Sequence, residues 1–256
     1  MNNSTSKRFV DWPTSWPSGS FRAFPLLLVV LLVVAPLVGY GIYGIWQAIL
    51  LGSAPVDTKA LGNPLLVILT LVLTLAAEGT LTLILVALLP WASRLSFREL
   101  GYRVPRARDV LVAFLGSLVM AVVANGGASL MQSLLHSNQD QQSVAMLRQL
   151  HDPRLLVAFA LFACVLAPLM EETIFRVFLF NALRRYFGFW SGAIVSGLCF
   201  GLAHGDPIAA LPLALGGVVL AVVYYRTHNA FASMITHGLF NSYTILALVL
   251  TPQLVK

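Results

Sequence analysis

The feature that most constrains this chain is a series of long apolar runs, because about 20 apolar residues suffice to cross a bilayer core as a helix. Of the 256 residues, 58% are hydrophobic and only 10% are charged. A soluble domain carries about 25% charged residues. The sequence therefore predicts an all-α fold, a polytopic membrane helix bundle whose surroundings are a lipid bilayer.

Seven such runs can be recognised, so we expect about seven transmembrane helices, with eight as the alternative count. They cover roughly residues 25–50, 64–89, 110–135, a run from 154 that carries an acidic pair, 190–204, 207–225 and 230–250. Residues 1–24 precede them and are rich in Ser, Pro and Gly, which predicts a disordered tail.

The distribution of Lys and Arg predicts the orientation of the bundle. With the N-terminus in the cytoplasm, eleven of the sixteen lie in cytoplasmic segments, four lie on the opposite side, and Arg176 lies within the membrane. Basic residues favour the cytoplasmic side, and we expect a basic amphipathic helix on the inner leaflet within residues 91–109. The net charge of +6 is thus a topology signal, and no nucleic-acid partner is expected.

Three ionisable residues, Glu171, Glu172 and Arg176, interrupt an otherwise apolar run. Charged residues within membrane segments cost several kcal/mol (about 2.5 to 3.5 on insertion scales), and they are usually functional. Glu172 and Arg176 lie one helical turn apart and can pair on one face. A structural ion pair would explain those two residues, but it would leave Glu171, rotated by about 100°, without a partner.

Three further polar residues lie in the apolar runs that follow. His204 ends the sequence C-F-G-L-A-H, while His237 and Asn241 share one helix face at a spacing of four residues. Taken alone, His204 could be a packing residue, and the other two could form an interhelical hydrogen-bonding pair. Together with Glu171 they form the polar set of a hydrolytic site, since a buried carboxylate can act as a base and the imidazole and amide groups can hold water and an oxyanion.

The same residues leave a metal open as an alternative. Glu171, His204 and His237 could be three ligands of a catalytic divalent metal such as zinc, although no HExxH motif is present. No other cofactor is expected. Glu78 is a further acid in an apolar run, and it could be a packing residue or a polar accessory to the cavity.

Three motifs resemble those of a known family. The segments E-E-T-I-F-R (171–176), F-G-L-A-H (200–204) and T-H-N-A-F-A-S-M-I-T-H-G-L-F-N (227–241) are similar to the EExxxR, FxxxH and HxxxN/B motifs of the CAAX-protease and bacteriocin-processing (CPBP, or Abi) family. This family of intramembrane endopeptidases is related to the type II CAAX prenyl endopeptidase. The resemblance covers about residues 150–250, and the 95–108 segment is similar to the loop that often precedes this core.

The resemblance implies a role for each motif residue. Glu171 would be the general base that activates water, His204 would hold the same water, and His237 and Asn241 would assist and stabilise the oxyanion. The remaining motif residues would shape the site: Glu172 and Arg176. A catalytic transmembrane core over residues 110–256 would then follow accessory helices and a basic cytoplasmic loop over residues 25–109.

The expected function is hydrolysis of a membrane-associated peptide or protein from the cytoplasmic side of a bacterial cell membrane. The alternative is a non-catalytic scaffold, immunity or regulatory protein that uses the same cavity to bind a partner. A proton relay or small transporter is a third reading, since Glu and His also serve in such chains. It predicts inverted repeats, and the sequence shows none.

Overall fold

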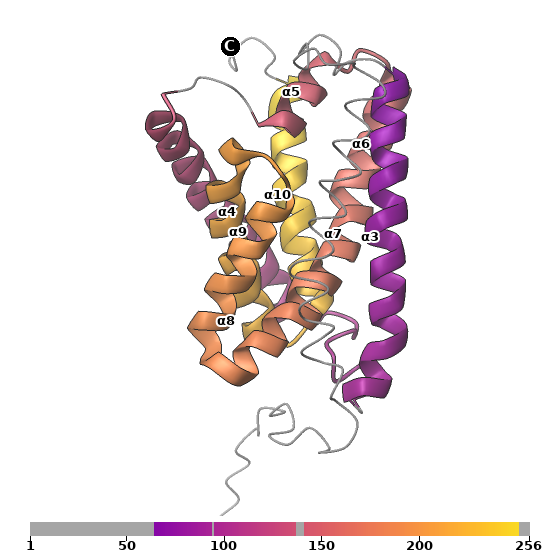
Figure 1. Ribbon diagram of the computed structural model, residues 1–256, viewed down its shortest axis with the longest axis vertical. Coiled ribbons are helices and arrows are strands. Elements are labelled where there is room, and N and C mark those ends of the chain that lie inside the picture. The colour runs from indigo at the N-terminus through magenta and orange to yellow at the C-terminus, as the bar shows by residue number, and fades with distance from the viewer. Residues whose placement is uncertain (1–63, 94, 137–140, 251–256) are drawn as a thin grey trace, which may run out of the picture.

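The computed structural model describes residues 64–93, 95–136 and 141–250, which form helices joined by turns, with no β-strand in these ranges. Figure 1 shows the long helices running roughly along one direction, with α3 at one side of the bundle and α4 at the other. The predicted all-α helical membrane bundle is confirmed. In the element labels that follow, η denotes a π-helical stretch. The elements are α3 (Pro64–Ser93), α4 (Ala107–Leu134), α5 (Gln142–Gln149), α6 (Pro153–Leu161), η3 (Phe162–Leu166), α7 (Ala167–Glu172), η4 (Thr173–Phe180), α8 (Asn181–Ala203), α9 (Pro207–Thr227) and α10 (Ala230–Leu250).

Five helical stretches within the described ranges are long and apolar enough to cross a membrane. They are Val67–Pro90, Ala107–Leu134, Pro153–Ala203, Pro207–Thr227 and Ala230–Leu250. The third holds both runs predicted as separate fourth and fifth spans, and it bends at Gly188, whose φ of 81° suits glycine. The predicted tail (1–24) and first span (25–50) lie outside the described residues, so the count of seven or eight spans stays a prediction.

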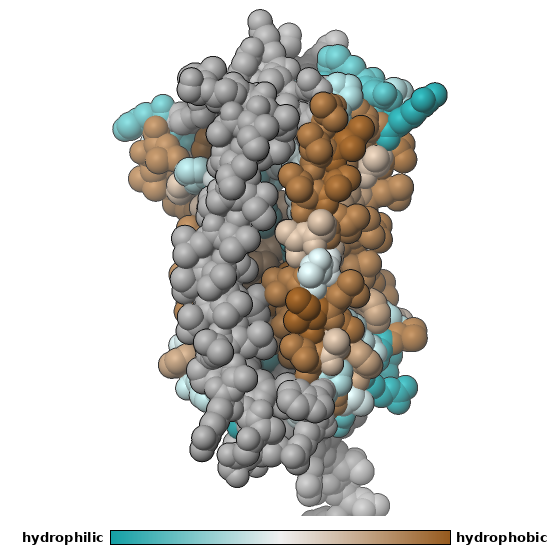
Figure 2. Space-filling model, turned by 45° about the vertical axis from the view of Figure 1, so that its right-hand side comes forward, coloured by the Kyte–Doolittle hydropathy of each residue, from teal (hydrophilic) through white to brown (hydrophobic). Residues whose placement is uncertain are grey.

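The outer surface of the described helices is strongly apolar. Leu83, Val122 and Leu250 are 71%, 74% and 73% exposed, respectively. Figure 2 shows hydrophobic side chains along the length of the visible face and hydrophilic ones gathered near its two ends. Soluble monomers do not expose apolar surface on this scale, and the protein is an integral membrane protein.

Helices α8 and α9 approach each other through small residues. Gly197 and Gly201 lie four residues apart on α8, and a Cβ added at Gly217 of α9 would stand 2.8 Å from the Cα of Gly197. A Cβ at Gly201 would collide with the carbonyl oxygen of Ala210. Small residues at this spacing let membrane helices pack backbone to backbone. This contact fixes the end of α8 that carries Phe200 and His204.

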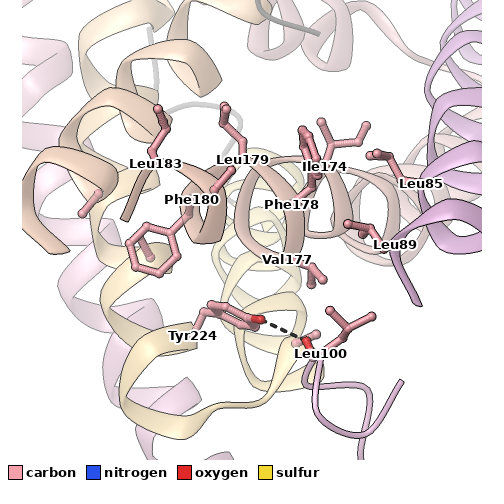
Figure 3. Close-up of a cluster of buried hydrophobic side chains, with 14 of the residues drawn as sticks. Leu85, Leu89, Leu100, Ile174, Val177, Phe178, Leu179, Phe180, Leu183 and Tyr224 are labelled. Atoms are coloured by element: carbon pink, nitrogen blue, oxygen red, sulfur yellow. Dashed lines mark hydrogen bonds between the residues drawn. The ribbon is translucent and has the colours of Figure 1, made fainter. Parts of the chain in front are cut away.

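The largest buried apolar cluster lies where η4 meets α3, α9 and the 95–106 loop. Figure 3 shows Val177 and Phe178 of η4 near Leu89 of α3, while the Tyr224 hydroxyl donates a hydrogen bond to the Leu100 carbonyl oxygen at 2.9 Å. The helix that follows the acidic motif is therefore held on several sides by close packing, which limits its freedom to shift.

The 95–106 loop is tied to the turn between α9 and α10. Arg103 pairs with Asp109 at 3.0 Å and donates to the carbonyl oxygens of Thr227 and His228 at 2.6 and 3.3 Å. The prediction of an amphipathic helix within residues 91–109 is wrong, because α3 continues to Ser93 and turns then lead to α4 at Ala107. The arginine expected at the lipid surface instead binds a carboxylate and two carbonyl groups. Residues before a proline such as Pro105 also disfavour helix.

Several segments predicted to be cytoplasmic meet at this end of the bundle. The guanidinium of Arg184 lies over the ring of Tyr225 at 5.2 Å, and the Ala230 amide donates to the Gly101 carbonyl oxygen at 2.9 Å. Met146 and Leu147 of α5 pack instead near Ile245, toward the far end of α10. The grouping of basic segments agrees with the charge pattern, while the orientation in a cell stays a prediction.

Candidate active site

The acidic pair lies on a short α-helical segment, α7, between the π-helical stretches η3 and η4. Insertions of π-helix are uncommon and occur frequently at functional sites. A π turn displaces the regular backbone ladder, and the Ala163 carbonyl oxygen of η3 accepts a hydrogen bond from Asn241 Nδ2 at 2.6 Å. Glu171 and Glu172 are both buried. The local backbone thus presents two adjacent carboxylates to the interior of the bundle.

Both carboxylate oxygens of Glu172 have partners. The residue is 0% exposed, and its Oε2 lies 3.2 Å from Arg176 Nε and accepts a hydrogen bond from the Ser233 hydroxyl. Its Oε1 lies 3.2 Å from His237 Nδ1. The predicted pairing of Glu172 with Arg176 is confirmed. Burial of the acid is offset by a cation and two donors, as a buried charge requires.

Arg176 is equally buried and is held on two faces. Its Nη2 donates to the Gly217 carbonyl oxygen at 3.4 Å, and its guanidinium carbon lies 4.3 Å from the centre of the Phe200 ring. Cation–π contact with a desolvated arginine contributes up to about 2 kcal/mol. The arginine therefore links the acidic motif to α8 and α9, and its role in shaping the site stays a prediction.

Glu171 contrasts with its neighbour because one of its oxygens is unsatisfied. Oε2 of Glu171 is buried without a hydrogen-bond partner and lies 3.7 Å from His237 Nε2. Since His237 Nδ1 faces the ion-paired carboxylate of Glu172, we assign the ring proton to Nδ1, which leaves a lone pair on Nε2. A water about 2.8 Å from each atom would contact both groups.

His204 lies at the end of α8, and both His204 and His237 contact the ring of Phe200. The Phe200 ring stands edge-on to both imidazoles, with centroid separations of 4.9 Å to His204 and 5.6 Å to His237. His204 Nδ1 bonds the Phe200 carbonyl oxygen at 2.8 Å, so Nδ1 carries the proton and Nε2 is the acceptor. The described contacts include no hydrogen bond or ion pair that joins His204 to Glu171, Glu172 or His237.

Asn241 shares the helix face of His237 but points its amide at η3. Its Nδ2 is committed to the Ala163 carbonyl oxygen, and a Cβ added at Gly238 would meet the Cys164 carbonyl oxygen. These contacts join α10 closely to η3. The structure therefore supports the interhelical hydrogen-bonding role considered for Asn241 and shows no contact between it and Glu171.

The three-ligand metal set was tested against the same geometry. Among the described residues, no three His, Cys, Asp or Glu side chains gather into a group that could hold a metal ion. His204 stands apart from Glu171 and His237, so the set does not fit a common coordination sphere in this arrangement. Zinc dependence stays a prediction that chelation can test.

A third acid approaches the site from α3. Glu78 has a buried Oε2 without a hydrogen-bond partner, and it lies close enough to Glu171 for their charges to interact. The sequence left two alternatives for Glu78, a packing residue or a polar accessory to the cavity. Its position beside the acidic motif favours the second description.

Two residues of the network were missed in the sequence. Ser233 precedes His237 by four residues, and Phe200 precedes His204 by the same interval, so a search of one helix face would have found both. Ser233 completes the hydrogen bonds of Glu172, and Phe200 contacts Arg176 and both histidines. Their roles depend on contacts between helices, which spacing alone does not give.

Comparison with known proteins finds a family model and two curated relatives that are similar to part of this chain. Residues 153–243 match the protein-family model described as type II CAAX prenyl endopeptidase Rce1-like. This segment runs from α6 to α10 and contains all the motif residues. The resemblance inferred from the motifs is confirmed: residues 153–243 are similar to the family of type II CAAX prenyl endopeptidases described as Rce1-like.

Two curated relatives share this core. The membrane-embedded CAAX protease MroQ of Staphylococcus aureus (strain USA300) is 34% identical over 110 residues, which is 40% of this chain and 44% of that protein. The putative membrane peptidase YdiL of Bacillus subtilis (strain 168) is 28% identical over 82 residues, 32% of this chain and 34% of that protein. The chain thus spans less than half the length of either relative, and no solved structure matches it.

Proposed function

We propose that this protein is an intramembrane endopeptidase that hydrolyses a peptide bond of a membrane-associated peptide or protein. Glu171 is the general base and His237 helps to hold the water that it activates. The family match over α6 to α10 and the names of the relatives, a CAAX protease and a putative membrane peptidase, support a peptidase of this class.

The observation that carries the proposal is the unsatisfied oxygen of Glu171. A buried carboxylate oxygen without a hydrogen-bond partner is costly, and a native structure tolerates it chiefly where function needs it. It faces His237 Nε2 at 3.7 Å, a separation that accommodates one bridging water. The other ring nitrogen of His237, Nδ1, is bound by the carboxylate of Glu172, which fixes the orientation and the tautomer of the imidazole.

The reaction follows from these positions. Glu171 takes a proton from the water, and the hydroxide adds to the carbonyl carbon of the substrate to form a tetrahedral oxyanion. The carbon–nitrogen bond then breaks, and the proton held by Glu171 passes to the leaving amine nitrogen. Glu172 and Arg176 remain paired throughout and keep His237 in place.

His204 and Asn241 act at the edges of this site. His204 is exposed at the end of α8, and its Nε2 lone pair can accept a hydrogen bond from the same water or from the substrate amide. Asn241 gives one amide hydrogen to Ala163, and its second remains as a donor toward an oxyanion. Both contacts would form only when a substrate is bound.

The site lies toward the basic end of the bundle. His237 is about 10 Å along the axis of α10 from its first residue, Ala230, at a rise of 1.5 Å per residue. We propose that this end faces the cytoplasm, since basic segments favour that side. A substrate would then reach Glu171 from the cytoplasmic leaflet.

The test is cleavage by the purified protein in liposomes. Hydrophobic peptides of varied sequence are supplied, and the products are identified by mass spectrometry. Glu171→Gln should lower the rate by about 10²- to 10⁴-fold, because a general base contributes that much. Thr80→Val, an exposed position on α3, should leave the rate unchanged. Equal cleavage by Glu171→Gln and the unmodified protein would refute the role of Glu171.

A second arm separates water activation by Glu171 from metal catalysis. Dialysis against a chelator should leave the rate unchanged if side chains alone activate the water. Loss of cleavage on chelation and recovery with Zn²⁺ would instead establish the metal alternative. A biological role that persists in the Glu171→Gln protein would favour the scaffold alternative.

A further inference from the structure

Glu78 lies halfway along α3 at the point where this helix crosses the acidic motif. The next residue, Gly79, would place an added Cβ 3.7 Å from Met170 Sδ, and the Thr82 hydroxyl donates to the Met170 carbonyl oxygen at 3.5 Å. Met170 immediately precedes Glu171. The register of α3 on α7 therefore brings a carboxyl group from a distant part of the sequence to the candidate site.

Two buried carboxyl oxygens face this region without partners. Oε2 of Glu78 and Oε2 of Glu171 each lack a hydrogen bond, and the charges of the two groups interact. α3 lies in an apolar membrane-spanning stretch, where an acid is costly unless it serves a purpose.

The surrounding charges favour a state in which one of the two carboxyl groups, Glu78 or Glu171, is protonated and the other is ionised. Glu171 is next to the ionised Glu172, faces His237 at 3.7 Å and also interacts with the charge of Arg176. Among the described residues no cation forms an ion pair with Glu78, and its buried Oε2 has no hydrogen-bond partner. Like charges in an apolar site cannot both ionise cheaply, so the acid without a cation retains its proton.

We propose that Glu78 is a further residue of the reaction: its neutral carboxyl group binds the nucleophilic water from the α3 side, opposite His237, while Glu171 removes the proton from that water. This inference rests on the proposed endopeptidase function. Glu78 keeps its own proton throughout the cycle. The water loses one proton to Glu171, its oxygen bonds to the substrate carbon, and that proton passes to the amine when the carbon–nitrogen bond breaks.

The role of Glu78 is tested with two substitutions that differ in hydrogen bonding. Glu78→Gln keeps a neutral group that donates and accepts, so its kcat should stay within about threefold of the original. Glu78→Leu removes both functions, so kcat should fall by about 10- to 100-fold, as the loss of one or two hydrogen bonds implies, with KM unchanged. Thr80→Val, on the exposed side of the same helix, is the control for insertion and packing.

Each outcome decides the inference separately from the proposed function. Wild-type kcat in Glu78→Leu, or an equally large loss in Glu78→Gln and Glu78→Leu, would overturn the role of a neutral carboxyl group. Loss in Glu171→Gln together with full activity in Glu78→Leu would leave the endopeptidase proposal standing alone. Infrared difference spectra do not depend on turnover: the carbonyl band of a protonated carboxyl group should disappear in Glu78→Gln at neutral pH, and its absence from the original protein would refute the proposal.

Discussion

The two carboxylates of α7 are neighbours in sequence but have opposite surroundings. Glu172 is bound by a guanidinium, a hydroxyl and an imidazole, while Glu171 has an oxygen that no described group satisfies. The first pattern is that of a structural charge, whose partners repay its burial. The second is that of a group held ready for a reactant. We propose that the acid with satisfied hydrogen bonds, Glu172, supports the site and that the also buried but unsatisfied Glu171 is the reactive one.

The largest expected effect on stability comes from breaking the ion pair between Glu172 and Arg176. Glu172→Gln would leave Arg176 as a buried cation without its counter-charge, which costs about 3 to 5 kcal/mol. Glu171→Gln should leave stability unchanged or raise it, because Oε2 of Glu171 has no hydrogen-bond partner that the substitution would remove. Thermal unfolding of both variants in the same detergent measures the difference.

A double substitution sharpens this prediction. Glu172→Met with Arg176→Met removes both charges at once, and buried pairs replaced by apolar residues often lose little stability. The double variant should therefore be more stable than Glu172→Gln, although inactive. Equal unfolding temperatures for Glu171→Gln and Glu172→Gln would contradict the distinction between the two acids.

Asn241 provides a smaller and more discriminating test. If its amide chiefly joins α10 to η3, Asn241→Leu should cost about 1 kcal/mol, as interhelical hydrogen bonds in membranes do. The rate of cleavage would then fall only in proportion to folded protein. A donor to the oxyanion would instead lower kcat by about 10²- to 10³-fold at full stability. Parallel measurement of unfolding and kcat distinguishes the two roles.

The sequence predicted those parts of the site that depend on spacing within one helix. The pairing of Glu172 with Arg176 follows from a separation of four residues, and the apolar runs gave the helical membrane class. It could not predict that Asn241 binds the Ala163 carbonyl group, because π-helical turns leave no mark in apolar periodicity. The approach of Glu78 to Glu171 was equally hidden, since the register of α3 on α7 depends on how Gly79 and Met170 pack.

Imidazole tautomers were likewise beyond the sequence. His204 was grouped with His237 because both are polar residues within apolar runs, yet the Nδ1 of His204 is bound to a carbonyl group of its own helix, and the contact shared by the two histidines is the Phe200 ring. The expected amphipathic helix over 91–109 failed for a related reason. Arg103 found partners in the turn after α9, and such long-range contacts outweigh local helix preference.

The smallest expected effect concerns His228, in the turn between α9 and α10 at the basic end. Burial and the nearby positive charges of Arg184 and Arg103 lower the pKa of His228 from its ordinary 6.5. The unfolded chain therefore takes up this proton first as the pH falls. Stability is independent of this group well above pH 6.5 and decreases as the pH falls through 6.5 toward the lower folded value.

The variant His228→Asn isolates this contribution. The backbone of His228 is left-handed, with φ of 49°, and asparagine tolerates that conformation better than other non-glycine residues. The unfolding temperature of the variant should fall less than that of the original protein between about pH 8 and pH 5. Identical pH dependence in both proteins would show that protonation of His228 does not contribute to the loss of stability at low pH. The contrast between satisfied and unsatisfied charge would then apply to the acidic motif alone.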